Sequence, residues 1–148
     1  MIVYKTGNLL DSSCECLVNT VNVVGVMGKG IAKDFKQKYP ALFEPYKVEC
    51  WSNHFHPGEV FVWRDTVTKK WIFNLATKNH WRDPSLYDWI WCGIYNLHAQ
   101  MLYKNTHSIA VPPIGCGNGG LNKAVVKQML ELFGKTFWLK YTVELYGF

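Results

Sequence analysis

The sequence lacks the features that define several large classes of protein. It has 5 cysteines, an odd number, and Cys14-x-Cys16 has no second pair to complete the spacing of a zinc site. The N-terminus, MIVYKTGN, lacks the apolar stretch of a secretory signal, and no apolar run is long enough to span a bilayer. We therefore expect a cytoplasmic protein with reduced thiols, no metal, no cofactor and no membrane partner.

Repeats, linkers and low-complexity tracts are also absent, so the 148 residues are predicted to form one domain, residues 1–148. Acidic residues are few: 11 Asp and Glu stand against 16 Lys and Arg, for a net charge of +5. Aromatic residues, by contrast, make up 16% of the chain. A positive charge favours a phosphate-bearing ligand, and exposed aromatic side chains stack on bases, although core packing accounts for most of them.

Strand-like and helix-like segments alternate along the chain. The β-branched run Cys16–Val23 predicts a buried strand. Ile31, Phe35 and Tyr39 recur every four residues, which predicts an amphipathic helix that ends at Pro40. The other predicted elements, in chain order, are the strand Ile2–Lys5, a short helix carrying Leu42, Phe43 and Tyr46, the hairpin strands Glu59–Trp63 and Trp71–Leu75, the helix Leu86–Lys104, the strand His107–Val111, the helix Asn122–Phe133 and the strand Tyr141–Tyr146. This order predicts an α/β fold, a three-layer α/β/α sandwich with a central mixed sheet.

Two glycine-rich loops stand at matching places in this alternation. NTVNVVGVMGKGIA, residues 19–32, and PPIGCGNGGLNK, residues 112–123, each follow an apolar strand and precede a helix. Neither fits a Walker A loop, and the Gly-x-Gly-x-x-Gly of the second lies too late in the chain for a dinucleotide fingerprint. Because ligands of α/β sheets bind at the carboxyl ends of the strands, both loops are predicted to hold one anion, such as a pyrophosphate, between two helix N-termini. The alternative is a pair of tight strand-to-helix turns.

Four motifs, in the expected order along the chain, resemble those of the macro domain family: Thr6–Leu10, Val18–Asn22, Gly25–Ala32 and Pro113–Leu121. Within that family the chain is most similar to the ADP-ribosyl glycohydrolase branch that includes the antitoxin DarG and the terminal ADP-ribose protein glycohydrolase. The resemblance implies a macro fold that binds ADP-ribose or an ADP-ribosylated substrate. It also implies that the second glycine-rich loop holds the diphosphate and distal ribose, and that the first closes over that ribose.

The resemblance further implies a set of ADP-ribose contacts. Asn8 stands where the family usually has an aspartate facing the adenine, and an asparagine keeps the acceptor oxygen but loses the charge. Asn22 matches the asparagine that hydrogen-bonds the distal ribose; the alternative is an asparagine that only caps its own turn. The expected contacts are Asn8, Leu9, Asn22, Gly25, Met27, Gly28, Lys29, Gly30, Ile31, Ile114, Gly115, Cys116, Gly117, Asn118, Gly119, Gly120 and Leu121.

The segment NLATKNHWRDPS, residues 74–85, carries the residue expected to do the chemistry. Lys78 follows an apolar strand, so we expect it at a strand end, where desolvation or a nearby cation would lower its pKa. It matches the catalytic lysine of the branch, which the resemblance implies attacks the anomeric carbon of the opened distal ribose. The alternative is a solvated surface lysine, and no acid/base partner for Lys78 is assigned. His80 and Trp81 are possible accessory residues, with His80 either a proton shuttle or a structural histidine.

The second glycine-rich loop also indicates which target carries the ADP-ribose. Gly119 stands where the protein-directed glycohydrolase has its catalytic aspartate, and the DarG-like pattern has glycine there. The resemblance therefore implies a thymidine base of single-stranded DNA as the target, with protein carboxylates second. The chain departs from the DarG pattern after Leu121, where it reads Asn122-Lys123 in place of Asp-Trp. The residues expected near the site to contact DNA, unless they are ordinary solvated side chains, are Lys69, Lys70, Trp81 and Arg82.

Two functions from other classes would use the same pocket. A phosphatase acting on ADP-ribose 1″-phosphate would release phosphate and need not depend on Lys78. A non-catalytic ADP-ribose binding module would turn nothing over, and Lys78→Ala would leave its affinity nearly intact. For the glycohydrolase, we expect a bacterial or phage protein that acts either alone or with a separately encoded ADP-ribosyltransferase.

Overall fold

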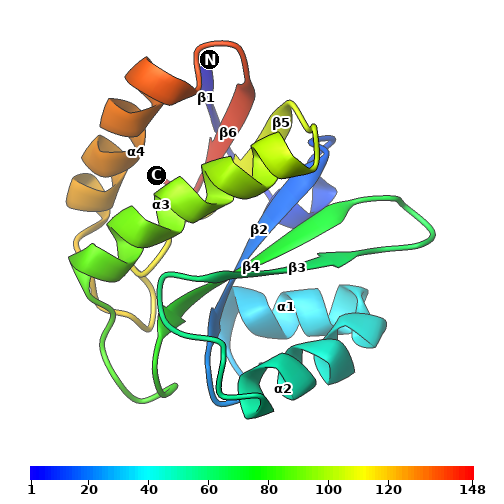
Figure 1. Ribbon diagram of the computed structural model, residues 1–148. Helices are drawn as coiled ribbons and strands as arrows, with labels where there is room; N and C mark the ends of the chain where they lie inside the picture. Colours follow the sequence, from blue (N-terminus) through cyan, green and yellow to red (C-terminus); the bar gives the residue numbers. More distant parts are fainter.

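A six-stranded sheet divides the computed structural model, which describes residues 1–148, into two helical layers (Figure 1). The strands are β1 (Ile2–Lys5), β2 (Cys16–Asn22), β3 (Val60–Arg64), β4 (Trp71–Lys78), β5 (Ser108–Val111) and β6 (Thr142–Tyr146). They lie in the order β1-β6-β5-β2-β4-β3, and every neighbouring pair is parallel except β3 and β4. The sheet is therefore mixed, as predicted, with one antiparallel strand at an edge.

Helices cover both faces of this sheet. They are α1 (Gly30–Lys38) and α2 (Phe43–Trp51) on one face and α3 (Tyr87–Tyr103) and α4 (Lys123–Phe137) on the other, with short 3-10 turns at Leu9–Asp11 and Pro40–Leu42 (Figure 1). The predicted three-layer α/β/α sandwich is confirmed. None of these helices combines the length and the apolar character needed to cross a bilayer.

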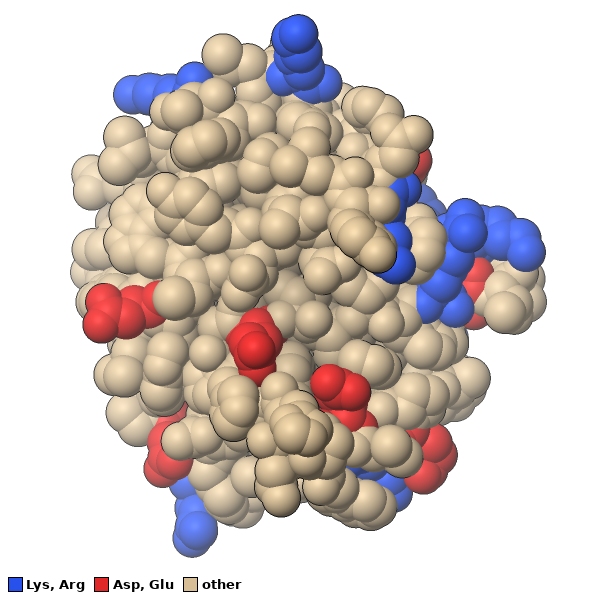
Figure 2. Space-filling view, viewed as in Figure 1, with Lys and Arg blue, Asp and Glu red and all other residues tan.

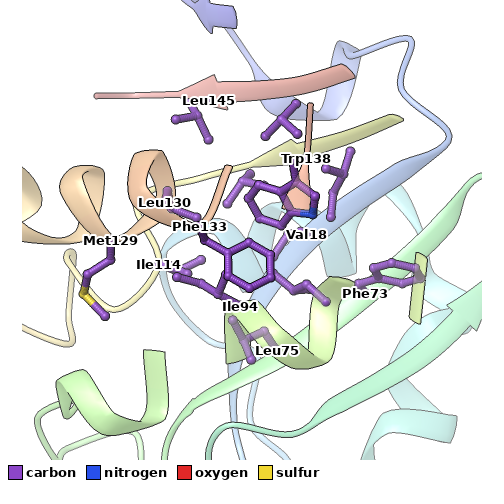
Figure 3. Close-up of a cluster of buried hydrophobic side chains, with 14 of the residues drawn as sticks. Val18, Phe73, Leu75, Ile94, Ile114, Met129, Leu130, Phe133, Trp138 and Leu145 are labelled. Atoms are coloured by element: carbon purple, nitrogen blue, oxygen red, sulfur yellow. The ribbon is translucent and has the colours of Figure 1, made fainter. Parts of the chain in front are cut away.

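The central strands are buried on both faces, which explains why they read as continuous apolar runs and do not alternate. Between the sheet and helices α3 and α4 lie 18 buried residues, among which the rings of Phe133 and Trp138 meet edge to face at 4.8 Å (Figure 3). A second cluster of 17 buried residues lies under α1 and α2 and includes Tyr46. Gly93 lets α3 approach β4 closely, since a Cβ there would lie 2.6 Å from Leu75 Cδ1. The sheet is therefore packed on both faces by a hydrophobic core.

Strand β4 is longer than the sequence predicts. It ends at Lys78 and not at Leu75, because its last residues stay paired with β2 although they are polar. A β-bulge interrupts this pairing: Val21 pairs with Ala76, whereas Asn22 pairs with Lys78, so that β4 holds one extra residue at this point. The bulge leaves Asn22 and Lys78 opposite one another at the ends of their strands.

Helix α4 begins as predicted and ends later. Asn122 is its N-cap, and the side-chain Oδ1 accepts hydrogen bonds from the backbone N–H groups of Ala124 (2.9 Å) and Val125 (3.3 Å). The helix continues past the predicted end at Phe133 to Phe137, whose ring packs 4.6 Å from that of Phe133. The ring of Phe137 also packs against that of Tyr95 on α3, 6.1 Å away, so tertiary packing supports the last turn of a helix whose sequence pattern fades after Phe133.

The topology gathers three loops at one edge of the sheet. Strands β5, β2 and β4 are neighbours and all parallel, so their carboxyl ends point the same way. The loops that follow them lie toward the lower left of Figure 1. Two of these loops are the glycine-rich ones, and the third carries the residues that follow Lys78. The carboxyl edge of the sheet is therefore where a binding site is expected.

Candidate functional site

A cavity of about 980 Å³ lies at this carboxyl edge, a volume within the usual range for small-molecule sites. Residues from all three loops line it. Of the residues singled out in the sequence, the cavity brings together Asn22, Gly28, Lys29, Gly30, Ile31, Lys78, Trp81, Arg82, Gly115, Cys116, Gly117, Asn118 and Gly119. Those outside its lining are Asn8, Leu9, Gly25, Met27, His80, Ile114, Gly120 and Leu121. Several of this second group shape the loops and do not line the cavity directly.

The loop after β5 turns its backbone donors toward this cavity. Gly115 and Gly120 have φ angles of +76° and +77°, in the left-handed region that favours glycine. The turn closes through the hydrogen bond from Leu121 N to Gly115 O at 3.0 Å. The backbone N–H groups of Gly117, Asn118 and Gly119 make no hydrogen bond within the protein. Successive free N–H groups in a turn form a concave site for an anion.

Gly119 has no space for a side chain. A Cβ there would lie 2.4 Å from both Gly115 O and Ser85 Oγ, well inside contact distance. Ser85, in the loop after β4, also donates its backbone N–H to Gly119 O at 2.9 Å. The loop conformation therefore excludes a carboxylate at this position, and it links the loop after β5 to the loop that follows Lys78.

The loop after β2 supplies a second set of donors. Helix α1 begins directly after Lys29, which makes no side-chain cap, and the N–H groups of Gly30, Ile31 and Ala32 have no acceptor in the first turn. All four of these residues line the cavity. An uncapped helix N-terminus carries partial positive charge, so α1 and the loop after β5 present donors to the same space.

Asn22 organises the start of this loop. Its Oδ1 accepts hydrogen bonds from the N–H groups of Val24 (3.1 Å) and Val26 (3.3 Å), and its Nδ2 donates to Val26 O (2.9 Å). The side chain is buried, with 7% exposed, yet the residue lines the cavity. Asn22 therefore caps its own turn, the alternative considered from the sequence, and an amide nitrogen still has a second hydrogen to offer a ligand.

Asn8 is also engaged locally. Its Oδ1 accepts a hydrogen bond from Leu10 N at 3.0 Å and caps the short 3-10 turn Leu9–Asp11. Leu9 is buried in the core under α1 and α2. The predicted adenine contacts of these two residues are not visible in the cavity lining, and they stay a prediction.

Lys78 is buried at the end of β4, with 8% of its surface exposed. Its Nζ donates a hydrogen bond to Trp81 O at 3.2 Å. Burial lowers the pKa of this amine, and the charge of Lys29 lowers it further, whereas Asp83 acts in the opposite direction. The predicted position at a strand end is therefore found, and the direction of the pKa shift favours the unprotonated form of the amine, which is the nucleophilic form.

The three residues after Asn79 form a small cluster at the cavity mouth. The ring of Trp81 is half exposed and has the imidazole of His80 4.9 Å away and the guanidinium of Arg82 5.4 Å away. His80 Nδ1 accepts hydrogen bonds from the backbone N (3.2 Å) and the Nε (3.4 Å) of Arg82. His80 thus holds Arg82 and Trp81 in place from outside the cavity, which favours the structural role over the proton shuttle.

The cavity lining is cationic. Lys29, Lys78, Arg82 and Lys123 line it, and no Asp or Glu does. Lys123 is unexpected, because it opens helix α4, where the helix dipole disfavours a positive charge. That unfavourable placement at a helix start is the sequence signal that would have identified Lys123. Nowhere in the chain do three or more His, Cys, Asp or Glu side chains gather as a metal site would require.

Lys69 and Lys70 do not belong to this site. They precede β4, whereas Lys78 ends it, and a strand of 8 residues spans about 25 Å. Lys70 Nζ is bound to the carbonyl oxygens of Ser12 (2.9 Å) and Cys14 (2.5 Å). In Figure 2 basic residues gather at the tip of the β3–β4 hairpin, at the right of the view. The expectation that these two lysines lie near the site was wrong, because sequence proximity to Lys78 runs along an extended strand.

Comparison with known proteins gives consistent results. The family model described as "Macro domain" matches residues 18–130. A DNA ADP-ribosyl glycohydrolase from Thermus aquaticus is 40% identical over 151 residues, which cover 97% of this chain and 42% of that protein. The macrodomain of Mycobacterium tuberculosis DarG has a TM-score of 0.92 at 41% identity, with 99% of this chain and 97% of that one covered. Thermosipho africanus DarTG in complex with ADP-ribose has a TM-score of 0.87 at 25% identity, covering 97% of this chain and 41% of that one. The chain spans about two fifths of the length of the curated relatives it matches.

Proposed function

This chain belongs to the macro domain family, and on that basis we propose that it is an ADP-ribosyl glycohydrolase, which removes ADP-ribose from a modified target. The observation that carries the proposal is Lys78, a buried amine of lowered pKa in a cavity lined by free backbone donors and cations. A binding module needs the donors and the cations, but it has no use for a buried lysine whose desolvation costs stability.

In the proposed complex the diphosphate of ADP-ribose lies against the free N–H groups of Gly117, Asn118 and Gly119 and faces the N-terminus of α1. The distal ribose lies between Asn22 and Lys78, which end neighbouring strands as register partners. This places the anomeric carbon beside the amine. Lys29, Arg82 and Lys123 offset the negative charge of the ligand from three sides.

The proposed reaction follows from the amine. The C1″–O4″ bond of the distal ribose opens, O4″ takes a proton from water, and C1″ is left as an iminium on the target. The unprotonated amine of Lys78 adds to C1″, the bond from C1″ to the target breaks, and the target leaves with a proton that the amine gives up. The hydroxide formed on ring opening adds to C1″ of the Schiff base, which releases ADP-ribose as an aldehyde and returns Lys78 as the free amine. The lowered pKa increases the unprotonated fraction of Lys78 that this addition needs.

The preferred target is a thymidine base of single-stranded DNA. Trp81 is half exposed at the cavity mouth, where a base attached to the distal ribose would meet its ring, and Arg82 lies beside it for a strand phosphate. Gly119 leaves no room for a catalytic carboxylate, which removes the group expected of the protein-directed enzyme. We further propose that a separately encoded ADP-ribosyltransferase produces this substrate.

The test uses a single-stranded oligonucleotide that carries ADP-ribose on thymidine. Wild type is expected to release ADP-ribose, and Lys78→Ala to release it at least about a hundredfold more slowly, measured by chromatography. Lys33→Ala, which removes an exposed lysine of α1 outside the cavity, is the matched control and should behave as wild type. Wild type that binds ADP-ribose and releases none would favour a binding module. Release of phosphate from ADP-ribose 1″-phosphate by Lys78→Ala would favour the phosphatase.

A further inference from the structure

Helix α2 contacts the start of the glycine-rich loop after β2 through one buried hydroxyl, that of Tyr46. Tyr46 is fully buried, and its hydroxyl lies 2.8 Å from Asn22 O and 2.9 Å from Asn22 Oδ1, within donating distance of both. The pocket of this hydroxyl is dry enough that burial raises the pKa of Tyr46. The two residues are 24 positions apart, so this contact joins separate elements.

The hydrogen bonds around Asn22 leave one orientation of its amide. Oδ1 already accepts from the N–H groups of Val24 and Val26, and a rotated amide would set its NH2 group against those two donors. The single hydrogen of the Tyr46 hydroxyl can be donated to this oxygen or to the backbone carbonyl oxygen of Asn22, and in either case the hydroxyl holds Asn22 against α2. The nitrogen therefore stays on the opposite side, where it donates to Val26 O.

Helix α2 packs closely on the rest of this loop as well. Gly25 has a φ of +91°, and a Cβ there would lie 3.5 Å from Lys47 Cγ and 3.5 Å from Trp51 Nε1. Both of those residues follow Tyr46 on α2. The loop after β2 is therefore held against α2 at two points, one apolar and one through the hydroxyl.

We propose that Tyr46 is a positioning residue that fixes the Asn22 amide for the distal ribose of ADP-ribose. Tyr46 does not line the cavity and touches no ligand; it acts through Asn22, which does line it. This inference rests on the proposed function, because it assigns the ribose to Asn22. It predicts that the hydroxyl affects only ligands that carry a distal ribose.

The experiment compares Tyr46→Phe with wild type in calorimetric titrations with ADP-ribose and with ADP, which lacks the distal ribose. Loss of the hydroxyl is expected to weaken ADP-ribose binding about fivefold and to leave ADP binding within about twofold, as the loss of one hydrogen bond would. Tyr39→Phe is the matched control, since it removes a hydroxyl from the same buried cluster but far from Asn22, and both affinities should be unchanged. Asn22→Ala should reproduce the selective loss.

The outcomes separate the two proposals. Wild type that fails to bind ADP-ribose overturns the proposed function and the inference with it. Wild type that binds ADP-ribose, with Tyr46→Phe weakening ADP-ribose and ADP equally, indicates general damage to the loop and overturns the inference alone. Unchanged ADP-ribose affinity in Tyr46→Phe also overturns it. Circular dichroism and thermal denaturation of each variant establish that the compared proteins are folded.

Discussion

At the scale of single residues, the buried amine of Lys78 couples activity to stability. A lysine whose pKa is lowered by the fold is destabilising wherever the unfolded chain would hold its proton, that is, below the ordinary lysine pKa. The cost therefore falls as pH rises toward that ordinary value, where the unfolded chain also loses the proton. This cost arises at the position where the proposed reaction uses an unprotonated amine.

The replacement Lys78→Met keeps the length of the side chain and removes its charge. We expect it to abolish turnover and to raise the midpoint of thermal unfolding at pH 7, with the gain shrinking as the pH rises from 7 toward the ordinary lysine pKa of 10.5. Thermal denaturation across this range provides the measurement. A variant less stable than wild type at pH 7, or a gain that grows with pH, would contradict a desolvated lysine.

Gly117 tests the placement of the diphosphate. A Cβ at this residue meets nothing within 4 Å, so Gly117→Ala should fold normally and bind ADP-ribose within a few-fold of wild type. Gly117→Glu would bring a carboxylate into the anion site, and repulsion is expected to abolish binding in calorimetry. Wild-type affinity in the glutamate variant would show that the diphosphate lies elsewhere.

At the scale of elements, helix α4 carries a charge that its own stability disfavours. A positive charge in the first turn of a helix costs about 0.3–1 kcal/mol, and Lys123 stands there with a well-formed Asn122 cap before it. Lys123→Glu should therefore raise the free energy of unfolding by about 1 kcal/mol and weaken ADP-ribose binding about tenfold or more. Denaturant unfolding and calorimetry measure the two effects. Lys127→Glu, outside the cavity on the same helix, should leave the affinity unchanged.

The sequence predicted these elements well because each carried a local signal. The strand-loop-helix order around both glycine-rich loops can be read from hydrophobic periodicity and the positions of the glycines. The position of the cavity could therefore be predicted, because ligands bind at the carboxyl ends of the strands. Other features depend on contacts between distant segments. The contact of the Tyr46 hydroxyl with Asn22 and the contact of Ser85 with Gly119 each join residues far apart in the chain. No local sequence pattern predicts such contacts. The misplacement of Lys70 had the same origin, since the extent of β4 is set by pairing with β2.

At the scale of the whole molecule, two groups of basic residues lie at opposite edges of the sheet. Lys29, Arg82 and Lys123 line the cavity, whereas Lys69 and Lys70 belong to the hairpin at the opposite edge of the sheet. Under the proposed function, the first group is the one beside a modified base that enters the cavity. A net charge of +5 favours a phosphate-bearing substrate in general, and the cavity group is then expected to set where such a substrate binds.

The salt dependence of oligonucleotide affinity is expected to distinguish the basic residues of the cavity from those of the hairpin. Each phosphate contact on a single strand contributes about 0.7 to the slope of log affinity against log salt concentration. Arg82→Ala should therefore reduce the steepness of that slope by about 0.7 for the modified oligonucleotide, measured by fluorescence anisotropy. Lys69→Gln, a change at the distant hairpin, is expected to leave the slope as it is. Equal slopes for Arg82→Ala and wild type would mean that Arg82 meets no phosphate.

The bulge near the end of β4 has a consequence for how this site tolerates change in length. Side chains of a strand alternate between faces, so one residue more or less reverses everything beyond it. Thr77, the extra residue between Ala76 and Lys78, therefore sets the face of the sheet from which the lysine projects. Deleting Thr77 would leave this lysine opposite Asn22 but turn its side chain to the other face, while keeping every lysine in the chain. Under the proposed function, this strand is expected to tolerate substitutions more readily than a change in its length.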